Sequence, residues 1–126
     1  QRPDYSMMGE GETTLLAPKM TEDILVLKRA SGDCFEQDVI YVTSTPFIIG
    51  KQYEAVNYHL SDNVVSRRHI EIRKEGRQYE VMDLSSTNGT WLNGSKLDSG
   101  VAYEIKQSDM LKIANIPFSV DLRVRQ

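Results

Sequence analysis

The chain is poor in cysteine, in long apolar runs and in basic charge. Its single cysteine, Cys34, excludes an internal disulfide framework and a cysteine-rich zinc site, and fits a reducing compartment such as the cytoplasm. No apolar run approaches the length of a membrane span and the start is not signal-like, so direct membrane insertion is not expected. The sequence begins with Gln1, which permits a piece of a longer protein.

The charge balance argues against nucleic acid as a partner. Acidic residues number 18 and basic residues 15, which gives a net charge of −3. Domains that bind a nucleic-acid duplex usually carry a basic excess. The densest basic cluster, within residues 67–74, is interrupted by an acid and by apolar residues. A small anionic ligand, which needs only a few local cations, remains compatible with this sequence.

What the chain does have is a series of short apolar runs separated by turn residues. With 40% hydrophobic and 26% charged residues over 126 positions, it suits one globular domain with its own core. At their spacing, and without a convincing amphipathic helix, the runs predict an all-β fold, a β-sandwich of about ten to eleven short strands. The expected strands cover residues 24–29, 38–42, 46–50, 69–74, 77–84, 90–92, 96–97, 102–105, 110–114 and 117–124.

Four motifs lie in the loops between these runs. Gly50-Lys51 ends one strand and Ser66-Arg67-Arg68-His69 precedes another, while the stretch Asp83 to Thr90 carries several hydroxyl groups. Asn93-Gly94 is the preferred dipeptide of a tight hairpin. In this order and at these intervals, the motifs resemble the forkhead-associated (FHA) domain, a family of phosphothreonine-binding β-sandwiches with an FHA/SMAD-like fold. The resemblance covers roughly residues 24–124.

The resemblance implies a phosphopeptide-binding role for six residues. Ser66 would donate its hydroxyl to a phosphate oxygen, Arg67 would contact the phosphate or the peptide backbone, and Thr87 would make a further phosphate or loop contact. Asn88, and also Asn93 from the hairpin, would hydrogen-bond the main chain of the peptide. Lys51 is the sixth, and it departs from the family, which usually has arginine there. Lysine keeps the charge and loses the planar fork, so one hydrogen bond would replace two at this position.

Other residues of the motifs are expected to support the loops. His69 would brace the binding loops by hydrogen bonds, and Asp83 would fix the following loop, since a carboxylate facing a phosphate would repel it. Gly50 and Gly89 would serve backbone geometry. We assign Arg68, the variable position of its motif, to solvent. Trp91 is expected in the core.

The first 22 residues differ from the rest and predict a flexible tail, followed by the FHA domain over residues 23–126. The tail carries Glu12-Thr13-Thr14, which is similar to a motif of some bacterial FHA proteins. In those proteins, kinase phosphorylation of one threonine creates a ligand for the protein's own domain. Thr13 and Thr14 are therefore expected phosphorylation sites, with a slight preference for Thr13, and binding in cis or in trans stays open.

Specificity in the family often depends on the third residue after the phosphothreonine. That residue is Leu16 if Thr13 is modified and Ala17 if Thr14 is. The pocket position just before Ser66 carries Val64 and Val65, which suit an aliphatic side chain better than an acidic one.

The sequence therefore predicts a phosphothreonine-peptide recognition module that mediates phosphorylation-dependent interaction between proteins. Its partner would be its own tail or another protein, and a Ser/Thr kinase is implied. We expect no catalytic residues, no cofactor and no metal. The alternatives are a domain that binds an unmodified partner and a regulatory appendage of a larger protein.

Overall fold

A computed structural model describes residues 23–30 and 38–124. The expected tail over residues 1–22, with Thr13 and Thr14, lies outside the described residues, and so does Cys34. None of the helical structure within the described ranges is long and apolar enough to cross a membrane.

The described residues form eleven strands and one short 3-10 turn. The strands are β2 (Asp23–Arg29), β3 (Val39–Val42), β4 (Phe47–Gly50), β5 (Tyr58–His59), β6 (Ile70–Glu75), β7 (Gln78–Asp83), β8 (Thr90–Leu92), β9 (Ser95–Lys96), β10 (Ala102–Ile105), β11 (Met110–Ile113) and β12 (Ile116–Val124). The turn η2 (Tyr53–Ala55) lies between β4 and β5.

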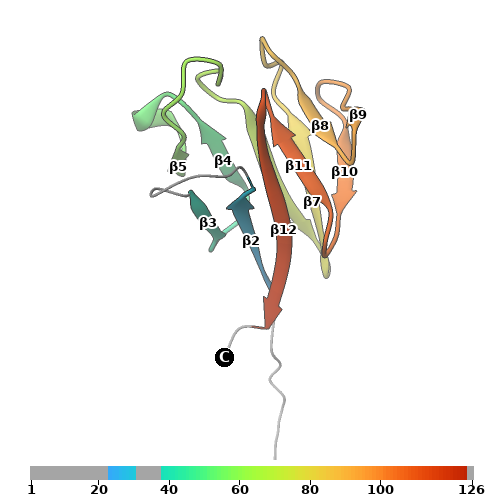
Figure 1. Cartoon of the computed structure of the whole chain (residues 1–126). Helices are drawn as coiled ribbons and strands as arrows, with labels where there is room; N and C mark the ends of the chain where they lie inside the picture. Colours follow the sequence, from blue (N-terminus) through green and yellow to red (C-terminus); the bar gives the residue numbers. More distant parts are fainter. Residues whose placement is uncertain (1–22, 31–37, 125–126) are drawn as a thin grey trace, which may run out of the picture.

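These strands build two sheets that face each other. One sheet has the order β10-β7-β6-β4-β5 and the other the order β3-β2-β12-β11-β8-β9 (Figure 1). All neighbouring strands are antiparallel except β4 and β5, where Ile49 pairs with Tyr58 in parallel. The predicted all-β sandwich is confirmed.

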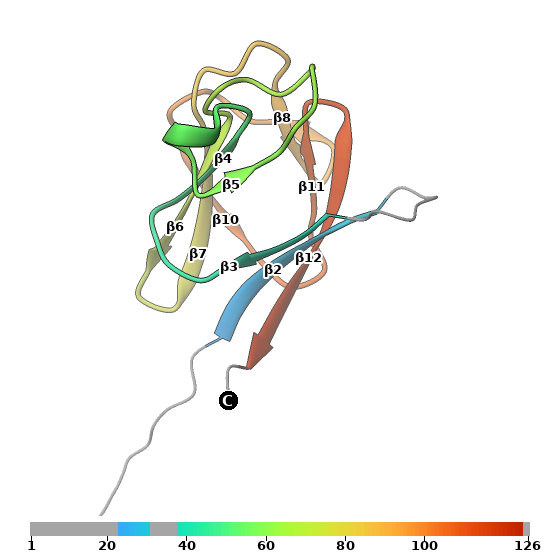
Figure 2. The ribbon, with the colours of Figure 1, turned by 90° about the vertical axis from the view of Figure 1, so that its left-hand side faces the viewer.

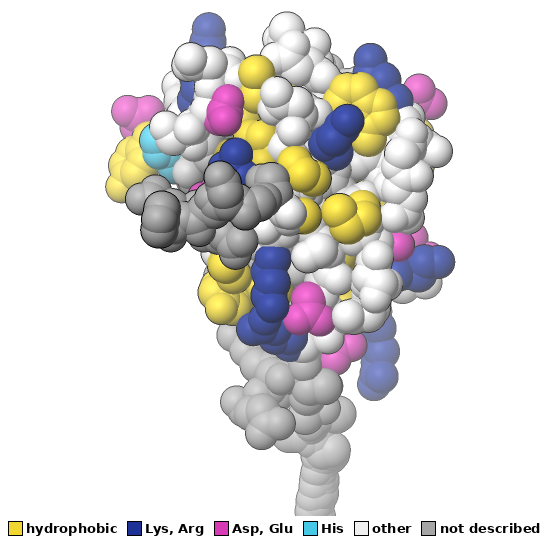
Figure 3. Space-filling view, in the orientation of Figure 1, with side chains coloured by type: hydrophobic (Ala, Val, Ile, Leu, Met, Phe, Trp, Pro, Cys, Tyr) yellow, Lys and Arg dark blue, Asp and Glu magenta, His cyan; other side chains and the backbone are white. Residues whose placement is uncertain are grey.

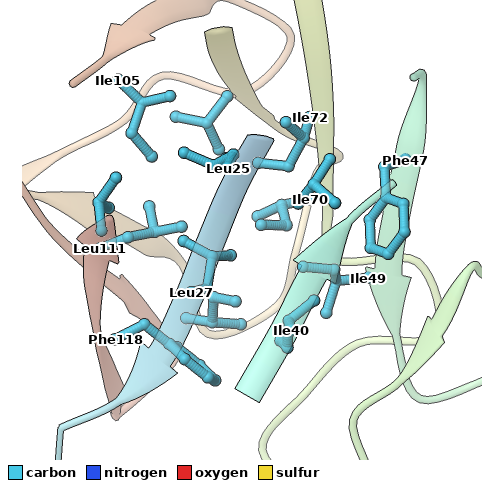
Figure 4. Packing of buried hydrophobic residues seen from close by; sticks show 14 of the residues in the cluster. Leu25, Leu27, Ile40, Phe47, Ile49, Ile70, Ile72, Ile105, Leu111 and Phe118 are labelled. Carbon is cyan, nitrogen blue, oxygen red and sulfur yellow. The ribbon is translucent and has the colours of Figure 1, made fainter. Parts of the chain in front are cut away.

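Alternation along the strands places one apolar set between the sheets. In β6, Ile70 and Ile72 are fully buried, whereas Arg73 between Ile72 and the hairpin is exposed. The core brings together β2, β11 and β12 from one sheet and β4, β6 and β7 from the other (Figure 4). Burial of this kind contributes roughly 25 cal/mol per Å² of apolar surface and is the main stabilising term of the sandwich.

The loops expected to carry the site gather at one end of the sandwich. The β5–β6 and β7–β8 loops lie at the end opposite to the start of β2 and the end of β12 (Figures 1 and 2). In β6 and β7, Ile70 pairs with Asp83, so the residues just before one strand and just after the other emerge side by side. The sheet register therefore positions the motifs next to each other.

Two details differ from the sequence-based prediction. The two-residue strand β5 and the turn η2 were not predicted. Trp91 is not part of the buried core cluster and lies half-buried on the outer face of its sheet. It pairs there with Lys112 and Lys96, whose Nζ atoms lie 4.8 and 5.8 Å from the ring centre. Figure 3 shows hydrophobic and Lys/Arg side chains together over β8 and β11 on this face.

Candidate functional site

The end of β4 packs directly against the loop before β6. The Lys51 amide donates to the Ser66 carbonyl at 2.9 Å, and the Gln52 amide donates to the Arg67 carbonyl at 3.1 Å. A Cβ on Gly50 would lie 2.7 Å from the carbonyl carbon of Arg67, which is main chain and cannot rotate away. Glycine is thus required here by close backbone approach, because any side chain would push the two segments apart.

His69 is fully buried beneath this loop and links it to the next one. Its Nδ1 accepts a 3.0 Å hydrogen bond from the Ser66 amide, so the ring hydrogen sits on Nε2 and is donated to the Gly89 carbonyl at 2.9 Å. Burial lowers the pKa of His69 from its ordinary value, against the opposing effects of the Gly89 carbonyl and Asp83. The neutral ring therefore holds the two loops at a fixed spacing.

Asp83 fixes the loop that follows β7. Its carboxylate accepts from the Ser86 hydroxyl and the Thr90 hydroxyl, both at 2.6 Å, and from the Ser86 amide at 3.1 Å. Burial acts to raise the pKa of Asp83, but these hydrogen bonds outweigh it and the pKa is lowered. The charged carboxylate of Asp83 therefore accepts hydrogen bonds that fix the loop, as expected from the sequence. The loop closes at Gly89, whose φ of +89° favours glycine.

Two further hydrogen bonds join the loops across their surface. The Thr87 amide donates to Oγ of Ser66 at 2.9 Å. Nδ2 of Asn88 donates to the Val64 carbonyl at 2.8 Å. These contacts span 21 and 24 residues of sequence, so they depend on the tertiary fold. They place Ser66, Thr87 and Asn88 in one continuous rim.

A surface hollow of about 400 Å³ lies at this rim. It is lined by Lys51, Val65, Ser66, Arg67, Arg68, Ser85 and Thr87. The three cations are exposed, and no ion pair among the described residues involves any of them. A concave site with several unpaired cations and hydroxyl groups is suited to an anion.

Asn88 lies next to this hollow and Asn93 does not line it. Asn93 has a φ of +52°, its Oδ1 accepts from the Met110 amide at 2.9 Å, and its Nδ2 donates to Asp109 at 3.1 Å. The side chain of Asn93 thus links the β8–β9 hairpin to the start of β11. Its expected contact with a peptide stays a prediction.

The two valines of the expected specificity pocket have different surroundings. Val65 is buried in the core cluster and also lines the hollow. Val64 is partly buried against the same cluster, and its carbonyl accepts from Asn88. An apolar surface therefore lies beside the cationic hollow, which is compatible with an aliphatic ligand side chain.

Sequence reasoning missed two residues of the lining, Arg68 and Ser85. Arg68 was assigned to solvent, and it is exposed, but it also lines the hollow. Ser85 has a left-handed φ of +58°, which the sequence did not indicate. For Arg68, the sequence did offer a signal, which was its position next to Arg67 in the same loop.

Comparison with known proteins identifies the family. The sequence model of the FHA domain family matches residues 47–114, which is more than half of the chain. The chain therefore belongs to the FHA domain family, as its loop motifs predicted. The Glu12-Thr13-Thr14 motif lies outside the matched residues.

Two bacterial relatives share part of this sequence. The oxoglutarate dehydrogenase inhibitor of Corynebacterium jeikeium is 41% identical over an alignment of 61 residues, and the match covers 44% of this chain and 42% of the relative. The glycogen accumulation regulator GarA of Mycolicibacterium smegmatis is 50% identical over 42 residues, 33% of this chain and 27% of the relative. The chain thus spans less than half the length of these curated relatives.

Solved structures of the family share the architecture. One is an FHA domain from an analysis of phosphothreonine-dependent FHA domain interactions, with a TM-score of 0.66 and 26% identity over 78% of this chain and 95% of that one. The FHA domain of FhaA, solved in complex with the intracellular domain of another protein, gives a TM-score of 0.64 and 27% identity over 76% of this chain and 98% of that one.

Proposed function

We propose that this chain binds phosphothreonine-containing protein segments through the hollow at the β5–β6 and β7–β8 loops. The observation that carries the proposal is the convergence of Lys51, Arg67 and Arg68 with the Ser66 hydroxyl around one surface hollow. A phosphate dianion requires several charge-assisted donors on a rigid support. The hydrogen bonds of His69 and Asp83 supply that rigidity.

The hydrogen-bond state of Ser66 and Asn88 supports these roles. Oγ of Ser66 accepts from Thr87, which uses a lone pair and leaves the hydroxyl hydrogen for a phosphate oxygen. Asn88 uses one amide hydrogen on the Val64 carbonyl, and its carbonyl oxygen and second hydrogen are left for a peptide main chain. Both residues thus combine a structural contact with unused capacity towards a ligand.

The choice of phosphothreonine rests on the family. The similar solved FHA domain comes from work on phosphothreonine-dependent interactions. Two relatives are named as an inhibitor and a regulator, which supports a regulatory binding role without catalysis for this chain. We extend the proposal to the chain's own tail, where phosphorylation of Thr13 or Thr14 by a Ser/Thr kinase would create a ligand bound in cis or in trans. A cytoplasmic location stays a prediction.

The second candidate is binding of an unmodified partner by the same loops. It is favoured by Lys51, because an ammonium cannot form the two parallel hydrogen bonds of the usual arginine. The two functions differ in one measurable property. Phosphate contributes to binding in the first and not in the second.

The test uses the full chain and peptide pools. Each fluorescein-labelled pool has randomised flanks around a fixed central residue, which is phosphothreonine, phosphoserine or unmodified threonine. Anisotropy should show binding of the phosphothreonine pool, weaker binding of the phosphoserine pool and none of the third. Equal binding of all three pools, or binding of none, would overturn the proposal, and equal binding would support the second candidate.

A separate experiment addresses the tail. The chain is phosphorylated with a Ser/Thr kinase and its hydrodynamic radius is measured over a range of concentrations. Compaction that does not depend on concentration indicates closure in cis, and growth with concentration indicates association in trans. An unchanged radius for both the wild-type chain and a Thr13→Ala/Thr14→Ala control would remove the tail from the proposal and leave the binding of other partners unaffected.

A further inference from the structure

The hollow has a third cation that the loop motifs do not account for. Arg68 lines it together with Lys51 and Arg67, although it occupies the variable position of its motif. It is exposed, as are the other two cations. The wall of the hollow therefore carries one more guanidinium than the motif requires.

The backbone under Arg68 is held in place by its neighbours. The residue before it accepts a hydrogen bond from the Gln52 amide, and the residue after it is the buried His69. Gly50 packs so closely that a Cβ there would lie 2.9 Å from Cα of Arg68. The base of the side chain is thus fixed against the end of β4, and Arg68 is one of the residues that line the hollow.

No described carboxylate competes for this guanidinium. The ion pairs among the described residues are Arg29–Asp38, Arg73–Glu71 and Arg123–Asp121, and each lies on strands or their edges. The carboxylate closest to the site by sequence, Asp83, is turned to Ser86 and Thr90. Arg68 therefore has its full set of donors available for an anion in the hollow.

Chemistry distinguishes Arg68 from Lys51. An ammonium acts as a point charge, whereas a guanidinium presents a planar fork that matches two phosphate oxygens. With lysine at position 51, Arg68 lines the same hollow as Lys51 and carries the planar fork that Lys51 lacks.

We propose that Arg68 is a direct phosphate ligand whose fork contributes the bidentate contact that Lys51 cannot make. The inference rests on the proposed phosphate-binding function of the hollow. If Arg68 contacts the phosphate, three cations surround it, and together they favour the phosphate dianion over the monoanion. Since the second ionisation of phosphothreonine falls near pH 6, this preference acts close to neutral pH.

The test compares three variants of the full chain. Arg68→Ala removes the guanidinium and keeps the Cβ, so the packing against Gly50 is preserved. Arg68→Lys keeps the charge and removes the fork. Arg77→Ala removes the same charge from the β6–β7 turn at the opposite end of the two strands, and it is the matched control. The probe is the fluorescein-labelled phosphothreonine pool described above.

Arg68→Ala should weaken binding of the pool about tenfold, as loss of a charge-assisted hydrogen bond implies. Arg68→Lys should be intermediate, Arg77→Ala should bind as the wild type, and all three should keep the wild-type melting temperature. In ³¹P spectra, the pKa of a bound phosphothreonine peptide should rise on Arg68→Ala. Arg68→Ala binding as tightly as Arg77→Ala, or Arg68→Lys binding as tightly as the wild type, overturns the inference. Failure of the wild type to bind the pool instead overturns the proposed function itself.

Discussion

The main-chain amide of Ser66 donates a 3.0 Å hydrogen bond to Nδ1 of His69. The residue expected to meet the phosphate is therefore held by a ring that is buried directly beneath it. Since the other ring nitrogen donates to the Gly89 carbonyl, one side chain sets the distance between both binding loops. The geometry of the site thus depends on the neutral state of His69.

This dependence predicts a loss of stability at mildly acidic pH. Burial lowers the pKa of His69 in the folded chain, so below its ordinary value of 6.5 the unfolded chain takes up the proton first. The free energy of unfolding is at its full value above about 6.5 and should fall as the pH drops from there towards the lowered pKa. Urea unfolding between pH 7.5 and about 5 measures it.

The matched controls for this prediction are histidine variants. In His69→Gln the fall below about pH 6.5 should be shallower, because the titrating ring is gone. His59→Gln changes an exposed ring and should retain the wild-type pH dependence. A wild-type slope in His69→Gln would show that the acid sensitivity arises elsewhere.

Substitution of Gly50 should damage both the fold and the site. In Gly50→Ala the new methyl group would meet the Arg67 carbonyl, and separating the two segments should cost about 3 kcal/mol. The control is Gly76→Ala, whose new methyl group would meet no atom within 4 Å. Its only cost is the left-handed φ of +64°, which should lower the free energy of unfolding by about 1 kcal/mol. Calorimetric melting and binding of the phosphothreonine pool separate them, since Gly76→Ala should bind normally. Equal destabilisation by the two changes would contradict the close approach.

Substitution of Asn93 can separate its role in the hairpin from a role in ligand binding. Asn93→Gly keeps the left-handed backbone and removes the side-chain contacts with Asp109 and Met110, so it should cost about 1 kcal/mol of stability. Because Asn93 does not line the hollow, Asn93→Gly should weaken binding of the phosphothreonine pool less than Asn88→Ala does. A loss of binding as large as that of Asn88→Ala would support the peptide contact of Asn93 expected from the sequence.

Tyr58 should titrate at unusually high pH. Burial and the 2.7 Å hydrogen bond to Asp38 raise its pKa from 10.0 to about 12. Because the folded pKa is raised, its contribution to stability is complete below pH 10 and is lost between 10 and about 12. Ultraviolet titration of the wild type should show one phenolate step near 12 that is absent in Tyr58→Phe. A step that persists in the variant would assign it to another tyrosine.

Periodicity in the sequence was sufficient for most of the fold. Ile70 and Ile72 alternate with Glu71 and Arg73, and Tyr79, Val81 and Asp83 share one face of β7. The two isoleucines and these three residues of β7 are all buried. Such alternation is informative because each strand must bury one face. The short strand β5 gave no such signal, since its two residues pair only because β4 lies beside them.

Trp91 shows where composition misleads. A large aromatic residue in a short strand suggests a core position, but its neighbours across the strands are two lysines. Their ammonium groups lie over the ring on the outer face. Cross-strand neighbours are set by register, which the local sequence does not specify.

The site was predictable in its members and less so in its geometry. The motifs pointed to Ser66, Arg67, Thr87 and Asn88, and the structure brings these four together. The inclusion of Arg68 in the lining and the hydrogen bonds of Asn93 with Asp109 and Met110 depend on contacts between residues far apart in the chain. Those contacts form within each sheet, between the end of β4 and the loop before β6 for Arg68, and between the β8–β9 hairpin and the start of β11 for Asn93.

The most direct test of the phosphate site is chemical-shift mapping on the ¹⁵N-labelled full chain. The ligand is the single phosphothreonine peptide that binds best in the pool experiment, before and after treatment with a phosphatase. The largest amide shifts should fall on Lys51, Ser66, Arg67, Thr87 and Asn88 with the phosphorylated peptide, and should vanish with the dephosphorylated one. The same shifts from both peptides, or shifts confined to the outer face of β8 and β11, would contradict phosphate recognition by these loops.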